Sequence, residues 1–309
     1  MKVVCAGVHV LDVLVRPVDG IPAGQNTALV EQMHITAAGT AAGTALTLAK
    51  LGAQVWSAGA IGDDPAGDLL VSLLDRAGIH TSTVIRKPGL STSMSVLPIR
   101  PNGERPSLHL LGANYTFAPA DIDWDVVGAA EHLHLGGPEL LGPQTSVDIL
   151  DRAKSLGLTT SVDLIAPGEL GSLDAIAAAL PFIDYLLPND EQVIGFTGQS
   201  DLHDGARVLL EAGAGTVIAT RGADGALIAG AEFVENIPAF DIDVVDTSGC
   251  GDAFSAGFLF GLSLGRDLRG AALLGSAAAA QVAQGLGSDH GDFDLESLDA
   301  FAVATQRSA

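Results

Sequence analysis

Residues 244–254 read VVDTSGCGDAF, and the apolar segment AFSAGFLFGLSLG continues from residue 253 to residue 265. Gly249 and Gly251 can adopt backbone angles that other residues avoid, and they let a ligand approach the chain closely. The beginning of a helix presents unpaired N–H groups and a partial positive charge, which favour bound anions such as phosphate. The stretch therefore predicts an anion site at the start of an apolar helix.

Asp252 is the unexpected residue of this stretch, because a carboxylate beside a bound anion repels it. Two interpretations are open. Aspartate often caps the beginning of a helix, which would give Asp252 a structural role only. Alternatively, the carboxylate takes part in the chemistry that is done on the anion. The stretch by itself does not decide between these interpretations.

The composition sets limits on the class of protein. The chain has 309 residues, of which 48% are hydrophobic, so it can bury a large core. Its formal net charge of -22 argues against nucleic acid or an anionic membrane as partner, since both attract basic surfaces. Its two cysteines fit neither a disulfide framework nor a zinc site, and the segment MKVVCAGVHVLDVLV is too short for a signal peptide. We therefore expect a cytoplasmic protein.

Strand-like and helix-like segments alternate along the chain. Residues 2–10 read as a first strand and residues 41–51 as a helix. Residues 54–62 then read as a buried strand, and residues 64–78 as a helix with Asp64 as its N-cap. The alternation continues to the C-terminal helices. This spacing predicts an α/β fold with a central, mostly parallel sheet and helices on both faces.

Two segments break this alternation. Residues 26–36 and 91–112 alternate polar and apolar side chains as antiparallel strands do, with an Asn-Gly turn signal at 102–103. Such strands do not join a parallel core easily. We expect a small β-sheet lid, with strands from about 13–36 and 91–112, inserted in a single domain that spans residues 1–309. A lid excludes water and completes a site when it closes.

Acidic or glycine-rich turns follow several of the predicted strands. Ligands of open α/β sheets bind at the carboxyl ends of strands, so turns that gather at this edge predict a shared pocket. The common phosphate motifs are missing, since no G-x-x-x-x-G-K-[ST] occurs and no G-x-G-x-x-G opens the first helix. The chain must therefore bind its anion in another way. The turns are Asp12, residues 37–43, Asp163, Asn189, residues 220–225 and residues 246–252.

The segment DTSGCGDAFSAGF (246–258) resembles the second signature of the ribokinase-like (PfkB) family of carbohydrate kinases, D-T-x-G-[AC]-G-D-x-F. The similarity extends from residue 3 to about residue 290 and keeps the order of the family's motifs. The chain is therefore identified as a member of this family, with a ribokinase-like fold. The further matching segments are GAIGDDPAGDLL (59–70), LPNDEQVIGFTG (187–198) and TRGADGALI (220–228).

The resemblance implies roles for the residues of the glycine turn. Asp252 would be the catalytic base that accepts the proton of an attacking hydroxyl, which supports the second interpretation of this residue. The N–H groups of Gly249, Cys250 and Gly251 would form an anion hole for the γ-phosphoryl group of ATP. Asp246 would help to bind a monovalent cation such as K+. The nucleotide and its Mg2+ would be bound near Thr220, Gly222, Gly225, Asn189 and Glu191.

The same resemblance implies an acceptor site on the other side of the glycine turn. The chain departs from the family there, because Gly43 stands where asparagine is common and the Asn and Arg that usually follow Asp163 are missing. Gln192 also replaces the glutamate of the N-x-x-E motif. A pocket with fewer polar groups suits free ribose poorly. The implied acceptor residues are Asp12, Gly39, Thr40, Gly43 and Asp163.

The resulting hypothesis is an ATP-dependent kinase that phosphorylates a hydroxyl of a sugar or nucleoside-like small molecule. It would use Mg2+ and form a homodimer through the lid, whose edges need to be covered. Two alternatives are open. One is a sugar-phosphate kinase of the phosphofructokinase type, for which Arg16, Arg100 and Arg105 would supply positive charge. The other is a non-catalytic small-molecule sensor on the same fold, which the change at Gln192 favours.

Overall fold

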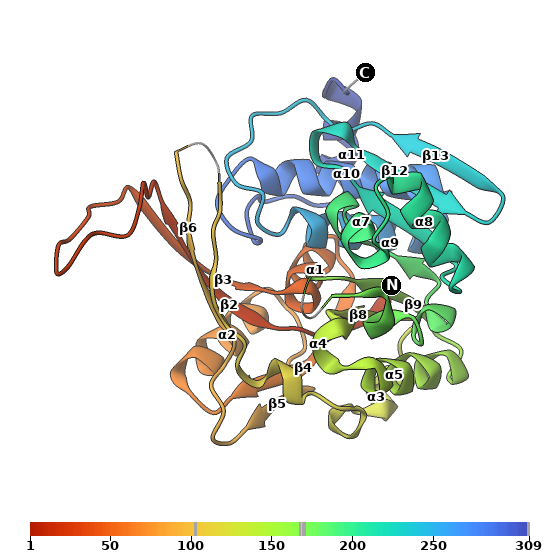
Figure 1. The fold of residues 1–309 in the computed structure, drawn as a ribbon, viewed down its shortest axis with the longest axis horizontal. Helices are drawn as coiled ribbons and strands as arrows, with labels where there is room; N and C mark the ends of the chain where they lie inside the picture. The colour runs from red at the N-terminus through yellow and green to blue at the C-terminus, as the bar shows by residue number, and fades with distance from the viewer. Residues whose placement is uncertain (102–103, 167, 169–170, 308–309) are drawn as a thin grey trace.

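A nine-stranded sheet forms the centre of the protein in a computed structural model that describes residues 1–101, 104–166, 168 and 171–307 (Figure 1). The strand order is β13-β12-β11-β10-β9-β8-β1-β4-β5. All neighbours from β5 to β11 are parallel, and only β12 and β13 pair in antiparallel fashion. The expected mostly parallel sheet is therefore confirmed. The strands are β1 (Lys2–Gly7), β4 (Gln54–Gly62), β5 (Val84–Lys87), β8 (His132–Gly136), β9 (Thr159–Asp163), β10 (Tyr185–Leu186), β11 (Thr216–Thr220), β12 (Ala226–Gly230) and β13 (Phe233–Ile237).

Helices cover both faces of this sheet (Figure 1). The side chains of β1 alternate, so that Val4 and Ala6 belong to the buried cluster that includes residues of α5, α7 and α8, whereas Val3 and Cys5 belong to the cluster that includes residues of α1, α2, α9 and α10. The two-faced burial explains why the strands are apolar throughout. The helices are α1 (Thr40–Lys50), α2 (Pro65–Arg76), α3 (Trp124–Gly128), α4 (Pro138–Leu141), α5 (Pro143–Ser155), α6 (Leu173–Ile176), α7 (Asp190–Thr197), α8 (Leu202–Glu211), α9 (Cys250–Ser263), α10 (Leu268–Ala283) and α11 (Leu295–Ala304).

The start of α2 agrees with the sequence signal. The carboxylate of Asp64 accepts a hydrogen bond from the N–H of Gly67 at 2.9 Å, and Pro65 occupies the first helical position. None of the helices in the described part of the chain has the length and apolar character needed to cross a membrane.

A four-stranded lid projects from one end of the body (Figure 1). Its strands are β2 (Val10–Arg16), β3 (Gln32–Ala38), β6 (Met94–Pro98) and β7 (Leu108–Leu110), in the order β3-β2-β6-β7. The β2–β3 and β6–β7 pairs are antiparallel, as expected, but the central β2–β6 pair is parallel. The connection from β2 to β6 passes through β3, α1, β4, α2 and β5, and such a crossover can bring two strands together in the same direction.

Two sequence expectations about the lid need correction. The first strand ends at Gly7, and Val10 already begins β2, so the lid starts earlier than residue 13. Asp12 therefore does not follow the first strand but lies inside a lid strand. The expected turn at 102–103 lies outside the described residues.

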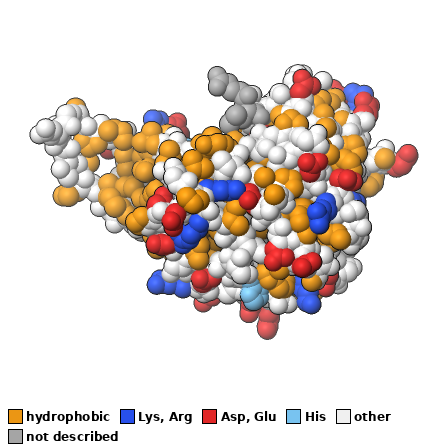
Figure 2. Space-filling model, turned by 90° about the horizontal axis from the view of Figure 1, so that it is seen from below, with side chains coloured by type: hydrophobic (Ala, Val, Ile, Leu, Met, Phe, Trp, Pro, Cys, Tyr) orange, Lys and Arg blue, Asp and Glu red, His pale blue; other side chains and the backbone are white. Residues whose placement is uncertain are grey.

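The strand register gives the lid two different faces. Val13, Ile35 and Val96 form one cross-strand row with Leu108, whereas the neighbouring row consists of Thr36, Asp12, Ser95 and His109. The apolar row is partly open to solvent, and hydrophobic side chains are visible along the projecting arm in Figure 2. We call the exposed apolar side chains of this face the outer lid face; they are Met33, Ile35, Val96, Leu108 and Leu110.

A buried asparagine fixes the lid to the body. Asn114 follows β7 and is completely buried. Its side-chain oxygen accepts from the N–H of His9 at 3.0 Å, and its amide nitrogen donates to the His9 carbonyl at 2.9 Å and to the Ser93 hydroxyl at 2.8 Å. His9 and Ser93 stand directly before β2 and β6, so one side chain sets where both lid strands begin.

Candidate active site

The glycine turn at the start of α9 has the geometry that the sequence predicted. Gly249 is the N-cap residue and adopts a left-handed conformation with φ 75°. A Cβ atom at this position would also lie 2.4 Å from the Cβ of Ser288. Both constraints require glycine. At the next positions, Gly251 is exposed and an added Cβ atom would meet no protein atom within 4 Å, whereas the N–H of Cys250 donates to the Thr247 carbonyl at 3.3 Å.

Asp252 does not cap this helix, because the N-cap is Gly249 and no side-chain cap hydrogen bond is present. Within the described part of the chain, no hydrogen bond to the Asp252 carboxylate is found. The carboxylate packs instead against α1, where a Cβ atom at Gly43 would lie 2.1 Å from its Oδ2 atom. A side chain at position 43 would thus occupy the place of the Asp252 carboxylate. In this structure, glycine at position 43 leaves room for the Asp252 carboxylate.

Three carboxyl groups share this region. Burial raises the pKa of Asp252 to about 7, the nearby Asp12 adds to the rise, and Arg105 opposes it. Burial raises the pKa of Asp12 to about 6, although a hydrogen bond from Ser95 and the charge of Arg105 lower it. Burial and the charge of Asp252 also raise the pKa of Asp163. A carboxyl group with a pKa near neutrality can accept a proton at physiological pH.

Asp163 connects this group to the helix that carries Asp252. It is the last residue of β9 and is 5% exposed. Ser255, one turn beyond the start of α9, donates a long hydrogen bond of 3.4 Å to its Oδ2 atom. The structure therefore brings Asp12, Asp163, Gly43 and Asp252 to one place from four separate elements.

The expected nucleotide residues line a second part of the site. Thr220, Gly222 and Gly225 border a cavity of about 570 Å³ together with Cys250 and Gly251. At Gly225, φ is 85° and a Cβ atom would lie 1.9 Å from the carbonyl oxygen of Ile237, so only glycine fits. Much of the remaining wall is apolar and suits a flat aromatic base. These apolar residues are Phe240, Ile242, Val244, Phe254, Ala279, Ala280 and Ala283.

Asn189 and Gln192 form a structural unit at the start of α7. Asn189 Oδ1 accepts from the N–H of Gln192 at 2.7 Å, and Gln192 Oε1 accepts from the N–H of Asn189 at 2.7 Å. Gln192 Nε2 donates to the carbonyls of Leu164 and Ile165, each at 2.9 Å. Glu191 is exposed, and neither it nor Asn189 lines the 570 Å³ cavity. A carboxylate at position 192 could not make the two donated bonds.

The start of α1 is close to the backbone of β8. Gly39 has φ 90°, and a Cβ atom there would lie 2.7 Å from the Val8 carbonyl oxygen. The hydroxyl of Thr40 is buried and has no hydrogen-bond partner in the described residues. It packs against Gly136, where a Cβ atom would lie 2.4 Å from Thr40 Oγ1. Gly39 and Thr40 thus contribute close backbone packing at this position.

Asp246 links the glycine turn to residues 284–292, which we call the C-terminal loop. Its Oδ1 atom accepts from the N–H of Ser248 at 3.0 Å and from the Ser248 hydroxyl at 2.8 Å. Its Oδ2 atom accepts from the N–H of Gly287 at 3.0 Å. Lys50 Nζ holds the same loop by donating to the carbonyls of residues 289, 290 and 291 at 2.6–2.9 Å. Asp246 therefore braces the turn.

Two further observations concern a cysteine nucleophile and a protein-bound metal ion. Burial, with a further contribution from Asp246, raises the pKa of the Cys250 thiol to about 12, so this residue is a neutral thiol and no nucleophile. In the described parts of the chain, no group of three or more His, Cys, Asp or Glu side chains has an arrangement that could hold a metal ion.

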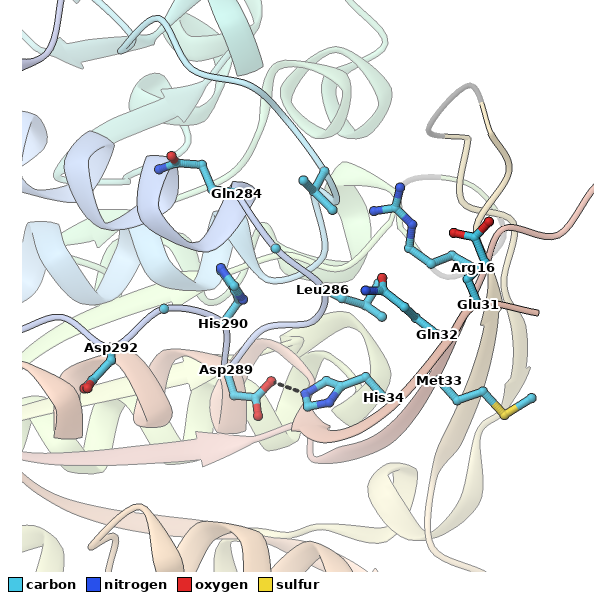
Figure 3. A pocket seen from close by; sticks show the side chains of 13 residues that line it. Arg16, Glu31, Gln32, Met33, His34, Gln284, Leu286, Asp289, His290 and Asp292 are labelled. Carbon is cyan, nitrogen blue, oxygen red and sulfur yellow. Dashed lines mark hydrogen bonds and ion pairs between the residues drawn. The ribbon is translucent and has the colours of Figure 1, made fainter.

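A larger cavity of about 960 Å³ lies elsewhere, between β3 and the C-terminal loop (Figure 3). Arg16, His34 and His290 are among its lining residues, and His34 Nε2 lies 2.7 Å from Asp289 Oδ1. Its lining includes Arg16, which the sugar-phosphate alternative used, but none of the residues predicted for the anion hole, the base, the nucleotide or the acceptor hydroxyls. Size alone is therefore a poor guide to the active site of this protein.

Sequence reasoning did not connect Arg105 with the glycine turn. Arg105 lies in the lid segment between β6 and β7, and its Nη1 atom donates to the hydroxyl of Ser248 at 3.0 Å. The sequence shows only an arginine in the lid. No spacing or motif indicates that it reaches a residue 143 positions away.

Comparisons with known proteins show the family and the fold of the chain. The family described as pfkB family carbohydrate kinase matches residues 2–293. The chain is 32% identical over 266 residues to the ATP-dependent ribose-1-phosphate kinase of Halopiger xanaduensis, covering 84% of each chain. It is 30% identical over 279 residues to the adenosine kinase of Saccharomyces cerevisiae, covering 84% of this chain and 81% of that one. The crystal structure of the ribokinase from Thermotoga maritima superposes with a TM-score of 0.78 at 26% identity, covering 97% of this chain and 98% of that one.

Proposed function

The chain belongs to the pfkB family of carbohydrate kinases, and we propose that its active site transfers the γ-phosphoryl group of ATP to a hydroxyl of a sugar or nucleoside-like small molecule. The observation that carries this function is the Asp252 carboxyl group. It stands in the first turn of α9, has no hydrogen-bond partner in the described residues, and has a pKa of about 7. A base in this position takes up a proton beside the anion-binding turn.

The reaction needs positioning and charge stabilisation more than covalent chemistry. The acceptor oxygen forms a bond to the γ-phosphorus, and the bond from this phosphorus to the β–γ bridging oxygen breaks, so that ADP leaves. The proton of the acceptor hydroxyl moves to Asp252. The N–H groups of Gly249, Cys250 and Gly251 stabilise the negative charge on the transferred group, with help from the partial positive charge of the helix start.

In this proposal, the nucleotide binds in the 570 Å³ cavity. Its apolar wall contacts the adenine base, while Thr220, Gly222 and Gly225 lie along the nucleotide. Mg2+ bound to ATP supplies neutralisation of the phosphate charge, and this ion usually keeps several waters and needs few protein ligands. The absence of a metal-holding cluster among the described residues is compatible with such binding. The three donors on Asp246 favour a bracing role over direct binding of a monovalent cation.

The acceptor side uses Asp12 and Asp163 as hydrogen-bond acceptors for hydroxyl groups. The named relatives act on a sugar phosphate and on a nucleoside, so membership of the family leaves the acceptor open. The alternative of a non-catalytic sensor rests on Gln192 and on the altered acceptor loops, and the intact Asp252 and glycine turn oppose it. Because Gln192 is engaged in capping α7 and holding residues 164–165, its presence is explained without loss of activity.

We further propose that two copies associate through the outer lid face. Met33 is 68% exposed and Leu108 is 62% exposed, and both lie on the same face of the lid sheet. Such a continuous apolar surface is unfavourable in water and would be covered by the same surface of a second copy. Sedimentation should show a dimer at micromolar concentration, and a monomer there would contradict this association. The two free cysteines support a reducing compartment such as the cytoplasm.

The decisive test is ADP release with a panel of sugars, sugar phosphates and nucleosides. We expect at least one acceptor to raise ADP release well above the rate without acceptor. The increase should disappear in Asp252→Asn. If ATP raises the melting temperature but no acceptor class raises ADP release, the protein is a sensor and the proposed function is wrong.

A further inference from the structure

A positively charged residue of the lid reaches into the carboxylate-rich site. Arg105 donates to the Ser248 hydroxyl at 3.0 Å, and Ser248 directly precedes Gly249 of the anion-binding turn. Ser248 is buried, whereas Arg105 is exposed, so the guanidinium group extends from the lid onto the body. In the parts of the chain that the structure describes, Arg105 makes no ion pair with a carboxylate. Its recorded partner is a neutral hydroxyl.

Arg105 differs from the other basic side chains near the site, which are already paired or are uncharged. Arg100, on the same lid segment, pairs with Glu104. Lys50 is held by three backbone carbonyls. His109 contacts the Ser95 hydroxyl at 3.0 Å, and burial lowers its pKa, so its ring is neutral at neutral pH. These groups are therefore engaged or uncharged.

Arg105 lies close enough to act electrostatically on both the acceptor residue Asp12 and the proposed base Asp252. Its positive charge partly offsets the rise that burial causes in the pKa of Asp12, on the acceptor side, and of Asp252, the base. Asp12 lies in the same cross-strand row as Ser95 and His109 on the inner side of the lid. The guanidinium group thus stands where the lid, the acceptor residues and the glycine turn meet.

The positive charge of Arg105 would be needed to bind a negatively charged acceptor in this site. Asp12, Asp163 and Asp252 can accept hydrogen bonds from the hydroxyls of a neutral acceptor without any cation. An acceptor that carries its own negative group would be repelled by these three carboxylates unless a positive charge were present. A guanidinium group offers a planar fork of donors that matches phosphate oxygens, and a phosphate can replace the neutral Ser248 hydroxyl as its partner.

We propose that the acceptor carries a phosphate ester and that Arg105 binds this group. This inference rests on the proposed function and names its substrate class as a sugar monophosphate. The reaction then converts ATP and a sugar monophosphate into ADP and a sugar bisphosphate, with the hydroxyl proton passing to Asp252. Arg105 is the residue that makes an anionic acceptor compatible with a carboxylate-rich pocket.

Binding measurements without nucleotide test this directly. Calorimetry would use ribose and fructose as neutral probes, and ribose 1-phosphate, ribose 5-phosphate and fructose 6-phosphate as charged ones. We expect the wild-type protein to bind at least one phosphorylated probe more tightly than its parent sugar. Arg105→Gln should weaken that binding about 10- to 100-fold and change the parent sugar's affinity by less than about threefold. Arg105→Lys should retain part of the preference, because the charge remains but the fork is lost.

Arg100→Gln is the matched control, since it removes a charge from the same lid segment that is already paired with Glu104. It should leave the preference unchanged. A wild-type protein that prefers none of the three phosphorylated probes over its parent sugar, or an Arg105→Gln variant that keeps the preference, would overturn the inference.

Kinetics separate this role from a contact with the transferred group. If Arg105→Gln lowers kcat equally for neutral and phosphorylated acceptors, Arg105 serves the γ-phosphoryl group and the inference is wrong. That result would leave the proposed function intact, provided that ADP release still depends on Asp252. If no acceptor raises ADP release, the proposed function fails, while the binding measurements still decide the role of Arg105.

Discussion

The proposed phosphoryl side and the proposed acceptor side of the active site are built in different ways. The glycine turn occupies seven consecutive residues, 246–252, and presents mainly backbone N–H groups. The acceptor side takes Asp12 from a lid strand, Gly43 from α1, Asp163 from the end of β9 and Arg105 from a lid segment. The charge of a transferred phosphoryl group is the same for every acceptor, so one local turn can serve it. The proposed acceptor groups come from separate elements of the lid and the body, and only the folded chain brings them together.

Two glycines illustrate the difference. A Cβ atom at Gly251 would meet no protein atom within 4 Å, whereas a Cβ atom at Gly43 would lie 2.1 Å from Asp252 Oδ2. On the phosphoryl side, the space above the glycine is open and available to a ligand. On the acceptor side, the space is already filled by the base. The same residue type therefore serves ligand access in one place and side-chain packing in the other.

The largest effect is expected where the two sides meet. Asp252→Asn should lower kcat by about 100- to 10,000-fold, because the amide cannot accept the hydroxyl proton. Its similar shape should preserve the contact with Gly43 and leave the dissociation constant of ATP nearly unchanged. Asp151→Asn, at an exposed position on α5, is the control and should behave like the wild type. Turnover by Asp252→Asn within twofold of the wild type would show that another group is the base.

The contrast between the two glycines can be tested by adding one methyl group to each. Gly43→Ala should lower kcat by about 100-fold, because the methyl group displaces the Asp252 carboxylate from its position. It should also lower the melting temperature while leaving ATP affinity largely intact. ADP release and calorimetric ATP binding would measure these effects.

Gly251→Ala is the counterpart on the phosphoryl side. It should keep or slightly raise the melting temperature, since alanine is favoured over glycine in a helix and meets no protein atom. Its activity should still fall, because the methyl group enters the space used by the phosphoryl group. If both variants lose stability to the same extent, the two sides do not differ in the way described.

The pH dependence sharpens the role of the shared carboxyl groups. With a pKa of about 7 in the free enzyme, Asp252 must lose its proton before it can act as base. We expect kcat/KM to fall about tenfold for each pH unit below this pKa and to level off above it. This decrease of kcat/KM at low pH should be absent in Asp252→Asn. A flat profile between pH 5 and pH 8 would contradict the assignment.

Stability should depend on pH in the opposite sense. The pKa of Asp252 is raised from 3.8 to about 7 by folding, so its contribution to stability is complete below pH 3.8 and is lost as the pH rises through 7. The melting temperature of the wild type should therefore decrease over this range because of Asp252. In Asp252→Asn this decrease should be smaller, which differential scanning calorimetry can measure.

The smallest effect is expected at Gln192, which holds the loop that follows β9. Gln192→Glu loses the two bonds donated to the carbonyls of Leu164 and Ile165 and should destabilise the protein by about 1–3 kcal/mol. The exposed Glu191→Gln should change stability by less than about 0.5 kcal/mol. An unchanged melting temperature in Gln192→Glu, together with a stronger dependence on Mg2+, would show that position 192 contacts the metal rather than the loop after β9.

Much of the fold could be predicted because the signals are local. The Asp64 cap, the strand at 54–62 and the helix that begins at the glycine turn each depend on a few neighbouring residues. The direction of the β2–β6 pair could not be predicted in the same way. Its two strands are separated by two helices and three other strands, and their alternation fits either direction.

The sequence by itself determined the α/β fold and the glycine turn at a helix start, because adjacent residues largely set the backbone conformation there. Asp252 became the catalytic candidate through the resemblance of the same stretch to the signature of the family. Only the tertiary structure decided how the acceptor side is assembled. It brought Gly43 against Asp252, engaged Gln192 with residues 164–165, and carried Arg105 to Ser248 across 143 positions. Such contacts depend on how the lid and the helices pack on the sheet, and local side-chain patterns do not record that packing.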